Sequence, residues 1–160
     1  MVAMSPPLPE SRFSVTLTHL DGYGFTAEFE PDGPRPIFVD EFPPLGNASG
    51  PNPTRLLATA VAHCLSASLL HCFGKQRIPV GGFRTTVEGR LTRNPRGRLR
   101  IADLRVVLQP AVESGEWERL GRCVDLFEDF CIVTESVRQG IPVEVVVEPV
   151  PAEATALSSR

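Results

Sequence analysis

The apolar positions of this chain are most concentrated between residues 53 and 74. Polar side chains in that stretch form one narrow stripe at helical spacing, made of Arg55, Thr59, His63 and Ser66. Asn52 suits the N-cap and Pro53 the first helical position, while Gly74 followed by Lys75 suits the C-terminal end. The pattern therefore predicts a long helix buried on nearly all sides, either at the centre of its domain or against a partner subunit.

Segments with β-strand patterns lie on both sides of this helix. Before it, the sequence predicts a hairpin and a short third strand, over residues 12–18, 23–30 and 36–40. After it, the sequence predicts a second hairpin, two helices and a last strand, over residues 80–91, 99–108, 116–130, 131–139 and 142–148. The hairpin turns are expected at Leu20-Asp21-Gly22 and Asn94-Pro95-Arg96-Gly97. This order of elements predicts an α+β fold with antiparallel strand pairing.

The length and composition are those of one globular domain. The 160 residues are 42% hydrophobic and 22% charged, and we expect a single domain over residues 12–150. Residues 1–11 and the tail 151–160 are predicted to be disordered. The first residues contain no basic segment followed by an apolar run, so we expect no secretory signal, a cytoplasmic location and reduced cysteines.

The charge pattern argues against nucleic-acid and membrane partners. The formal net charge is -3, and the arginines between residues 84 and 100 have no interleaved aromatic residues. We interpret these arginines as the solvated faces of a hairpin rather than a nucleic-acid surface. The predicted helix carries one arginine and two histidines without flanking aromatic belts, so we do not expect it to span a membrane.

Two of the four cysteines carry the candidate chemistry. Cys64 lies in the apolar helix, and Cys131 lies 67 residues later, where a further helix is predicted to begin. The N–H groups and dipole of a helix N-terminus would favour the Cys131 thiolate. A thiol in an apolar helix and a second thiol able to reach it are the parts of a two-cysteine peroxide-reducing cycle. We interpret Cys72 and Cys123 as packing residues.

Helix geometry argues against a Cys64–Cys72 disulfide and against a zinc site. Cys64 and Cys72 are eight residues apart, about 12 Å along one helix, whereas a disulfide requires Cα atoms within about 7 Å. Each cysteine follows a histidine, and the two His-Cys pairs are too far apart for one zinc ion to bind both. We therefore expect no bound metal.

Two segments resemble the active-site elements of the OsmC/Ohr family, which are bacterial thiol peroxidases linked to osmotic induction and organic hydroperoxide resistance. The first, GPNPTRLLATAVAHC at residues 50–64, places Pro53 eleven residues before Cys64, as in the family's first active-site helix. The second, Cys131-Ile132-Val133 with the strand that follows it, is similar to the segment that carries the resolving cysteine.

The resemblance covers roughly residues 12–148. It implies the OsmC-like fold, in which the antiparallel sheets of an intertwined homodimer wrap around two buried central helices. It further implies that Cys64 is the peroxidatic cysteine, which a hydroperoxide substrate oxidises to a sulfenic acid. Cys131 would then form a disulfide with Cys64, and an external dithiol would restore both thiols. No metal or organic cofactor is implied.

The chain departs from the family pattern near both cysteines. Thr54 stands where the family has a glutamate, and Ile132 stands where it has a proline. Glu135 or Asp129, beside Cys131, are candidates to replace the lost carboxylate.

The family's thiolate-stabilising arginine comes from the N-terminal strands, where this chain offers Arg12 or Arg35. Arg55 lies about 13 Å from Cys64 along the helix, and an unperturbed thiol, with a pKa of about 8.5, is mostly protonated at neutral pH.

Two other functions stay open. A non-catalytic member of the fold would bind a small apolar ligand in the dimer-interface pocket, with Cys64 as a lining residue, and Thr54 favours this alternative. A different thiol chemistry such as acyl transfer would need a base such as His63 beside Cys64, but consecutive helical residues point about 100° apart.

Overall fold

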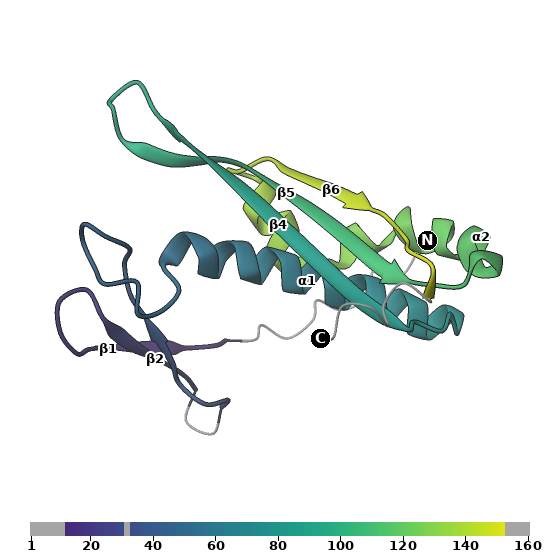
Figure 1. The fold of residues 1–160 in the computed structure, drawn as a ribbon, viewed down its shortest axis with the longest axis horizontal. Coiled ribbons are helices and arrows are strands. Elements are labelled where there is room, and N and C mark those ends of the chain that lie inside the picture. Colours follow the sequence, from purple (N-terminus) through teal and green to yellow (C-terminus); the bar gives the residue numbers. More distant parts are fainter. Residues whose placement is uncertain (1–11, 31–32, 153–160) are drawn as a thin grey trace, which may run out of the picture. The chain divides into compact units, whose positions relative to one another are not determined.

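The strands form two separate three-stranded sheets, one from residues before the long helix and one from residues after it (Figure 1). The structure is a computed structural model that describes residues 12–30 and 33–152. The predictions of disorder for residues 1–11 and 153–160 lie outside the described residues. The chain divides into two compact units, with the boundary between Pro53 and Thr54.

The first unit is an antiparallel sheet in the order β1-β2-β3. Its strands are β1 (Val15–His19), β2 (Phe25–Phe29) and β3 (Ile37–Val39). The predicted hairpin and third strand are confirmed. Gly22 has a φ of 50° in the turn between β1 and β2, a conformation that glycine adopts without steric cost.

A buried carboxylate organises the loop that follows β3. Asp40 is 5% exposed and accepts hydrogen bonds from the backbone amides of Glu41, Asn47 and Ser49 at 2.8, 3.1 and 3.2 Å. Burial by itself raises the pKa of this carboxyl. The three amides outweigh burial, so the pKa of Asp40 is lowered.

We expect Asp40→Asn to release this loop, because an amide side chain lacks the charge and one of the two accepting oxygens. Hydrogen exchange at the amides of Asn47 and Ser49 should become several-fold faster, whereas Asp125→Asn, at an exposed position, should leave it unchanged. Since the folded pKa is lowered, the wild-type contribution is present above about pH 4 and is lost as the pH falls through the folded pKa. Equal exchange in both variants would contradict this role.

The long helix α1 (Pro53–Gln76) begins where the sequence predicts and ends later than predicted. The helix continues through Gly74 to Gln76. The chain leaves it at Arg77, which adopts a left-handed conformation with a φ of 54°. The amide of Ile78 donates to the carbonyl of Phe73 at 2.9 Å, and the amide of Arg77 donates to that of Gly74 at 3.2 Å. These are the two hydrogen bonds of a Schellman motif. Ile78 joins the hydrophobic core beyond the turn, so burial fixes the end of the helix.

Among the described residues of the second unit, one stripe of α1 is buried. Its members follow each other at intervals of one turn and are Val61, Leu65, Leu69 and Phe73. Leu70, on another side, is 43% exposed. Within the second unit α1 contributes its stripe to the centre of the core, which is one of the two predicted alternatives. Burial of its other sides against a partner subunit stays a prediction. By length and composition alone α1 could also cross a membrane, but core helices of soluble proteins pass the same test.

The second sheet has the order β4-β5-β6 and contains one parallel pair. Its strands are β4 (Gly82–Arg93), β5 (Leu99–Ala111) and β6 (Val143–Val147). The hairpin of β4 and β5 is antiparallel, as predicted, but the expectation of antiparallel pairing throughout is wrong for β6. The helical crossover between β5 and β6 returns the chain to the end of the sheet from which β5 starts, so the two strands run in the same direction.

This crossover contains η1 (Ser114–Glu116), α2 (Trp117–Val124), η2 (Phe127–Phe130) and α3 (Ile132–Arg138). The single helix predicted over residues 116–130 is wrong, because the helix stops at Val124 and resumes as a 3₁₀ turn. Leu126, with a φ of -122°, interrupts it. The tighter turn that follows holds Phe127, which is 1% exposed.

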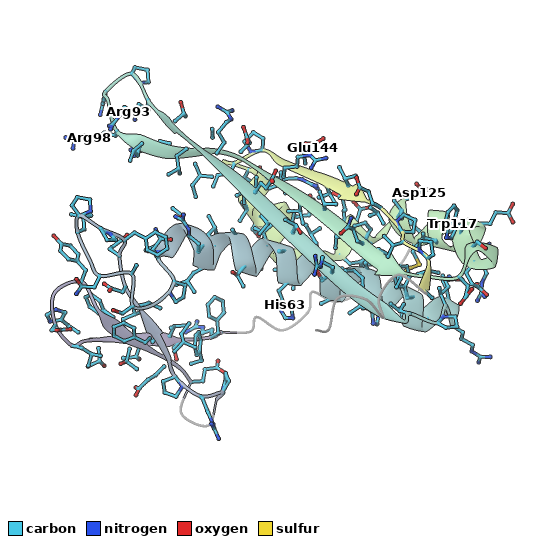
Figure 2. All side chains as sticks on the ribbon, in the orientation of Figure 1. His63, Arg93, Arg98, Trp117, Asp125 and Glu144 are labelled. Carbon is cyan, nitrogen blue, oxygen red and sulfur yellow. A yellow bond between two sulfur atoms is a disulfide. The ribbon has the colours of Figure 1, made fainter. Side chains whose placement is uncertain are left out.

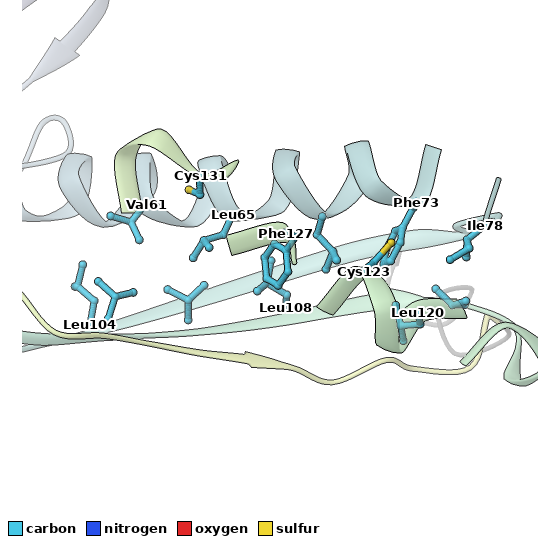
Figure 3. Close-up of a cluster of buried hydrophobic side chains, with 14 residues drawn as sticks. Val61, Leu65, Phe73, Ile78, Leu104, Leu108, Leu120, Cys123, Phe127 and Cys131 are labelled. Atoms are coloured by element: carbon cyan, nitrogen blue, oxygen red, sulfur yellow. The ribbon is translucent and has the colours of Figure 1, made fainter. Parts of the chain in front are cut away.

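The core of the second unit lies between one face of the second sheet and the helices (Figure 3). The sheet contributes alternate residues of β5, as expected for a strand with one buried face, namely Leu104, Val106 and Leu108. The helices contribute the buried stripe of α1 together with Leu120, Cys123 and Phe127. The packing places α1 and the crossover next to each other over the same sheet face.

Candidate functional site

The structure brings Cys64 and Cys131 together. Cys64 is half-buried on α1, and Cys131 is completely buried as the N-cap residue of α3. Both thiols are free, and they are near enough for Cys64 to raise the pKa of Cys131. Figure 3 shows the Cys131 sulfur beside α1, between the labelled residues Val61 and Leu65. The fold thus makes neighbours of two residues that are 67 positions apart in the sequence.

Burial raises the pKa of the Cys131 thiol, and the neighbouring Cys64 thiol raises it further. The Thr134 hydroxyl and backbone oppose this effect by hydrogen bonding, and the Cys131 thiol donates to Thr134 Oγ1 at 2.9 Å. The predicted position of Cys131 at a helix start is confirmed. The predicted lowering of its pKa is wrong, because removing a thiolate from water outweighs the favourable groups at the start of this short helix.

Thr134→Val should raise the pKa of Cys131 further, because it removes a hydroxyl that donates to the thiolate. The measurement is the pH dependence of ultraviolet thiolate absorbance, made in a Cys64→Ser background so that Cys131 is the single free thiol. Thr86→Val, at an exposed position on β4, is the matched control and should not change the titration. A titration unmoved by Thr134→Val would show that this hydroxyl does not contact the thiolate.

A groove of about 820 Å³ runs along α1 past Cys64. One wall consists of α1 residues, among them Cys64, Cys72 and Lys75, and the other contains Leu126, Phe127, Phe130 and Val133. His63 also lines the groove and is labelled where it projects outward from α1 in Figure 2. The Cys64 thiol therefore borders both an apolar groove and the buried Cys131 thiol.

Cys72 and Cys123 form a disulfide between α1 and α2, with their Cα atoms 5.7 Å apart. The interpretation of these two residues as packing residues, and the expectation that all four cysteines are reduced, are therefore wrong. The two residues are 51 positions apart, and no sequence spacing predicts their pairing. The fold brings them together because α2 packs on the same core as the last turns of α1.

Charged residues near Cys131 form an ion-pair cluster. Arg138 makes salt bridges with Glu128 and Glu135. Burial lowers the pKa of Arg138, but Glu128 and then Glu135 outweigh it, so the net pKa is raised. Glu135, one of the candidates to replace the family carboxylate, thus binds Arg138, and the other candidate, Asp129, is exposed.

Of the two positions where the chain departs from the family, Ile132 follows Cys131 directly and is exposed, whereas Thr54 lies elsewhere. Arg55 donates to the Thr54 hydroxyl at 3.3 Å, and both residues line a separate hollow of about 250 Å³ between α1 and the β4–β5 hairpin. Arg12 and Arg35 are exposed residues of the first unit. Within residues 12–30 and 33–152, no three side chains of metal-binding type are grouped around a common point.

The fold and the site define a class of protein: an α+β domain in which a half-buried cysteine on a long helix faces a buried cysteine on the crossover. The chain belongs to the OsmC-like protein family, whose sequence model matches residues 46–146. No curated protein matches the sequence.

Several solved structures share this fold. An OsmC-like protein from Mycoplasma pneumoniae has a TM-score of 0.73 at 19% identity, covering 88% of this chain and 99% of its own. An OsmC-like protein of unknown function from Vibrio cholerae has a TM-score of 0.69 at 23% identity, covering 88% and 100%. The organic hydroperoxide resistance protein OhrB of Bacillus subtilis has a TM-score of 0.62 at 21% identity, covering 85% and 98%.

Proposed function

We propose that this protein is a thiol-dependent peroxidase that reduces organic hydroperoxides. The observation that carries the proposal is the position of Cys64, which borders the buried Cys131 thiol on one side and an apolar groove on the other. The exposed side chains of Leu126 and Phe130 would contact the carbon chain of a hydroperoxide in this groove. Membership of the OsmC-like family and the fold shared with organic hydroperoxide resistance proteins support the same function.

The proposed cycle uses only thiol chemistry. The Cys64 thiolate attacks the distal peroxide oxygen, the O–O bond breaks, and the alcohol leaves with a proton. The Cys131 sulfur then attacks the Cys64 sulfenic acid, water leaves, and a Cys64–Cys131 disulfide forms. Thr134 stabilises the Cys131 thiolate at this step by donating its hydroxyl hydrogen. An external dithiol reduces the disulfide by two exchange steps.

One equivalent of cumene hydroperoxide should remove two hydrogens from the protein and link Cys64 to Cys131, as measured by non-reducing intact mass and peptide mapping. Cys64→Ser should abolish dithiol-dependent turnover because it removes the nucleophile. Cys131→Ser should leave a Cys64 sulfenic acid that dimedone traps, or sulfinic acid at higher peroxide. If the double variant consumes peroxide at the wild-type rate, the proposal is wrong.

The second candidate function is binding of a small apolar ligand without catalysis. It is favoured by the placement of Thr54, which lines a hollow separate from the Cys64 groove and supplies no carboxylate. The same mass measurement decides between the two functions. A protein whose mass is unchanged by peroxide, with both thiols still free, would be a binding protein that kept the fold and lost the chemistry.

We also propose that a second copy of the chain covers the exposed side of α1, as the family resemblance implies. Apolar side chains left exposed in this part of the chain support the proposal, with Leu70 at 43%, Phe130 at 75% and Ile132 at 82%. Large apolar side chains that are exposed in a single chain are frequently buried when subunits associate.

Sedimentation equilibrium should therefore give twice the chain mass of 17.4 kDa. Leu70→Glu should shift the protein toward the monomer, because it places a charge in the buried interface. Thr86→Glu introduces the same charge at an exposed position on β4 and should leave the mass unchanged. A wild-type protein that sediments as a monomer would rule out the dimer.

A further inference from the structure

Two cysteine pairs connect the same two segments of the chain. Cys64 faces Cys131, and Cys72 is bonded to Cys123. The two partners on α1 are eight residues apart, and so are the two on the crossover. The segments therefore run antiparallel to each other, with the free thiol pair at one end and the disulfide at the other. Phe127 lies midway along residues 123–131 and packs in the core that both segments share.

Besides the disulfide, the segment 123–131 is attached through a few buried side chains and through the ion pair of Glu128 with Arg138. Its buried side chains are Cys123, Phe127 and Cys131, whereas Leu126 and Phe130 are 57% and 75% exposed. It also lacks continuous helical hydrogen bonding, because the helix is interrupted at Leu126. The position of Cys131 therefore depends on a small number of contacts, and the disulfide is the covalent one among them.

We propose that the Cys72–Cys123 disulfide is a positioning crosslink that holds Cys131 against Cys64, and that a dithiol entering the groove opens it. Holding the segment covalently at its Cys123 end keeps the Cys131 thiol at a high effective concentration beside Cys64. In the peroxidase cycle, on which this consequence depends, an open crosslink slows disulfide formation and leaves the Cys64 sulfenic acid to further oxidation.

The groove gives a dithiol access to one sulfur of the disulfide. Cys72 is half-buried and lines the groove, whereas Cys123 is completely buried. A thiolate of the dithiol attacks Cys72 Sγ, the Cys72–Cys123 bond breaks, and Cys123 leaves as a thiolate that takes a proton. The second thiol of the reagent then displaces Cys72, so the reagent becomes a disulfide and the protein gains two thiols.

The first test measures how well Cys64 and Cys131 are juxtaposed, without any peroxide. Diamide oxidises neighbouring thiols to a disulfide, and the rate of Cys64–Cys131 formation is followed by alkylation and peptide mapping. In Cys72→Ser/Cys123→Ser the rate should fall by about ten-fold or more, given how strongly such reactions depend on geometry. An unchanged rate would overturn the proposal.

A packing variant separates the crosslink from general loosening of α2. Leu120→Ala removes a buried side chain of α2 but keeps the disulfide. Its diamide rate should stay within about two-fold of the wild type if the crosslink positions Cys131. If Leu120→Ala slows the reaction as much as the double serine variant does, packing rather than the disulfide holds the segment.

A second measurement needs no substitution and covers the case in which the double variant does not fold. Wild-type protein is titrated with dithiothreitol and pulsed with iodoacetamide. Labelling of the buried Cys131 should rise in step with the opening of Cys72–Cys123 and fall again after reoxidation. Labelling of Cys131 that is independent of the disulfide would contradict the proposal.

The peroxide experiment distinguishes this inference from the proposed function. In the double serine variant, dimedone trapping should show that Cys64 is oxidised within about two-fold of the wild-type rate, while the yield of Cys64 sulfinic acid increases. If Cys64 is not oxidised in the wild type, the peroxidase function fails and the diamide rates still test the crosslink. If Cys64 is oxidised and resolved equally in both proteins, the crosslink inference alone fails.

Discussion

Packing of one stripe of α1 on the second sheet is the interaction on which the rest of this unit depends. Val61, Leu65, Leu69 and Phe73 recur at intervals of one turn, and alternate residues of β5 meet them from the sheet. The four side chains lie on one stripe of the helix. One rotation of α1 about its axis therefore turns all four of them toward the sheet. That rotation leaves Cys64 at the edge of the core, half-buried and open to the groove.

The crossover completes the same core and thereby places the second thiol. Leu120, Cys123 and Phe127 bury themselves beside the α1 stripe, and Cys131 follows at the start of α3. Complete burial has a chemical consequence, since it raises the pKa of the Cys131 thiol and makes the hydrogen bond with Thr134 the main local source of stabilisation for a thiolate. Burial therefore shields the Cys131 thiol from solvent and also lowers the fraction of it that is thiolate, the reactive form.

The groove lies beside the buried stripe of α1, outside the core of the second unit. The groove is mostly apolar, and its polar side chains, such as His63, His71 and Lys75, come from α1. Both cysteines of α1 border it, so a molecule in the groove meets a free thiol and a disulfide along the same helix. The redox state of one pair can therefore influence the geometry of the other through the segment that both share.

Local patterns in the sequence determined most of the elements. The cap and proline before α1, the hairpin turns and the alternation in the strands each act within a few residues, and the structure has these elements at the predicted places, with the final strand included. The family motifs also singled out Cys64 and Cys131, which the structure brings together. Tertiary packing decided the rest: the parallel direction of β6, the end of α1 beyond Gly74, the break at Leu126 and the Cys72–Cys123 bond. Each of these depends on which distant surface a segment packs against, and short-range periodicity carries no information about that partner.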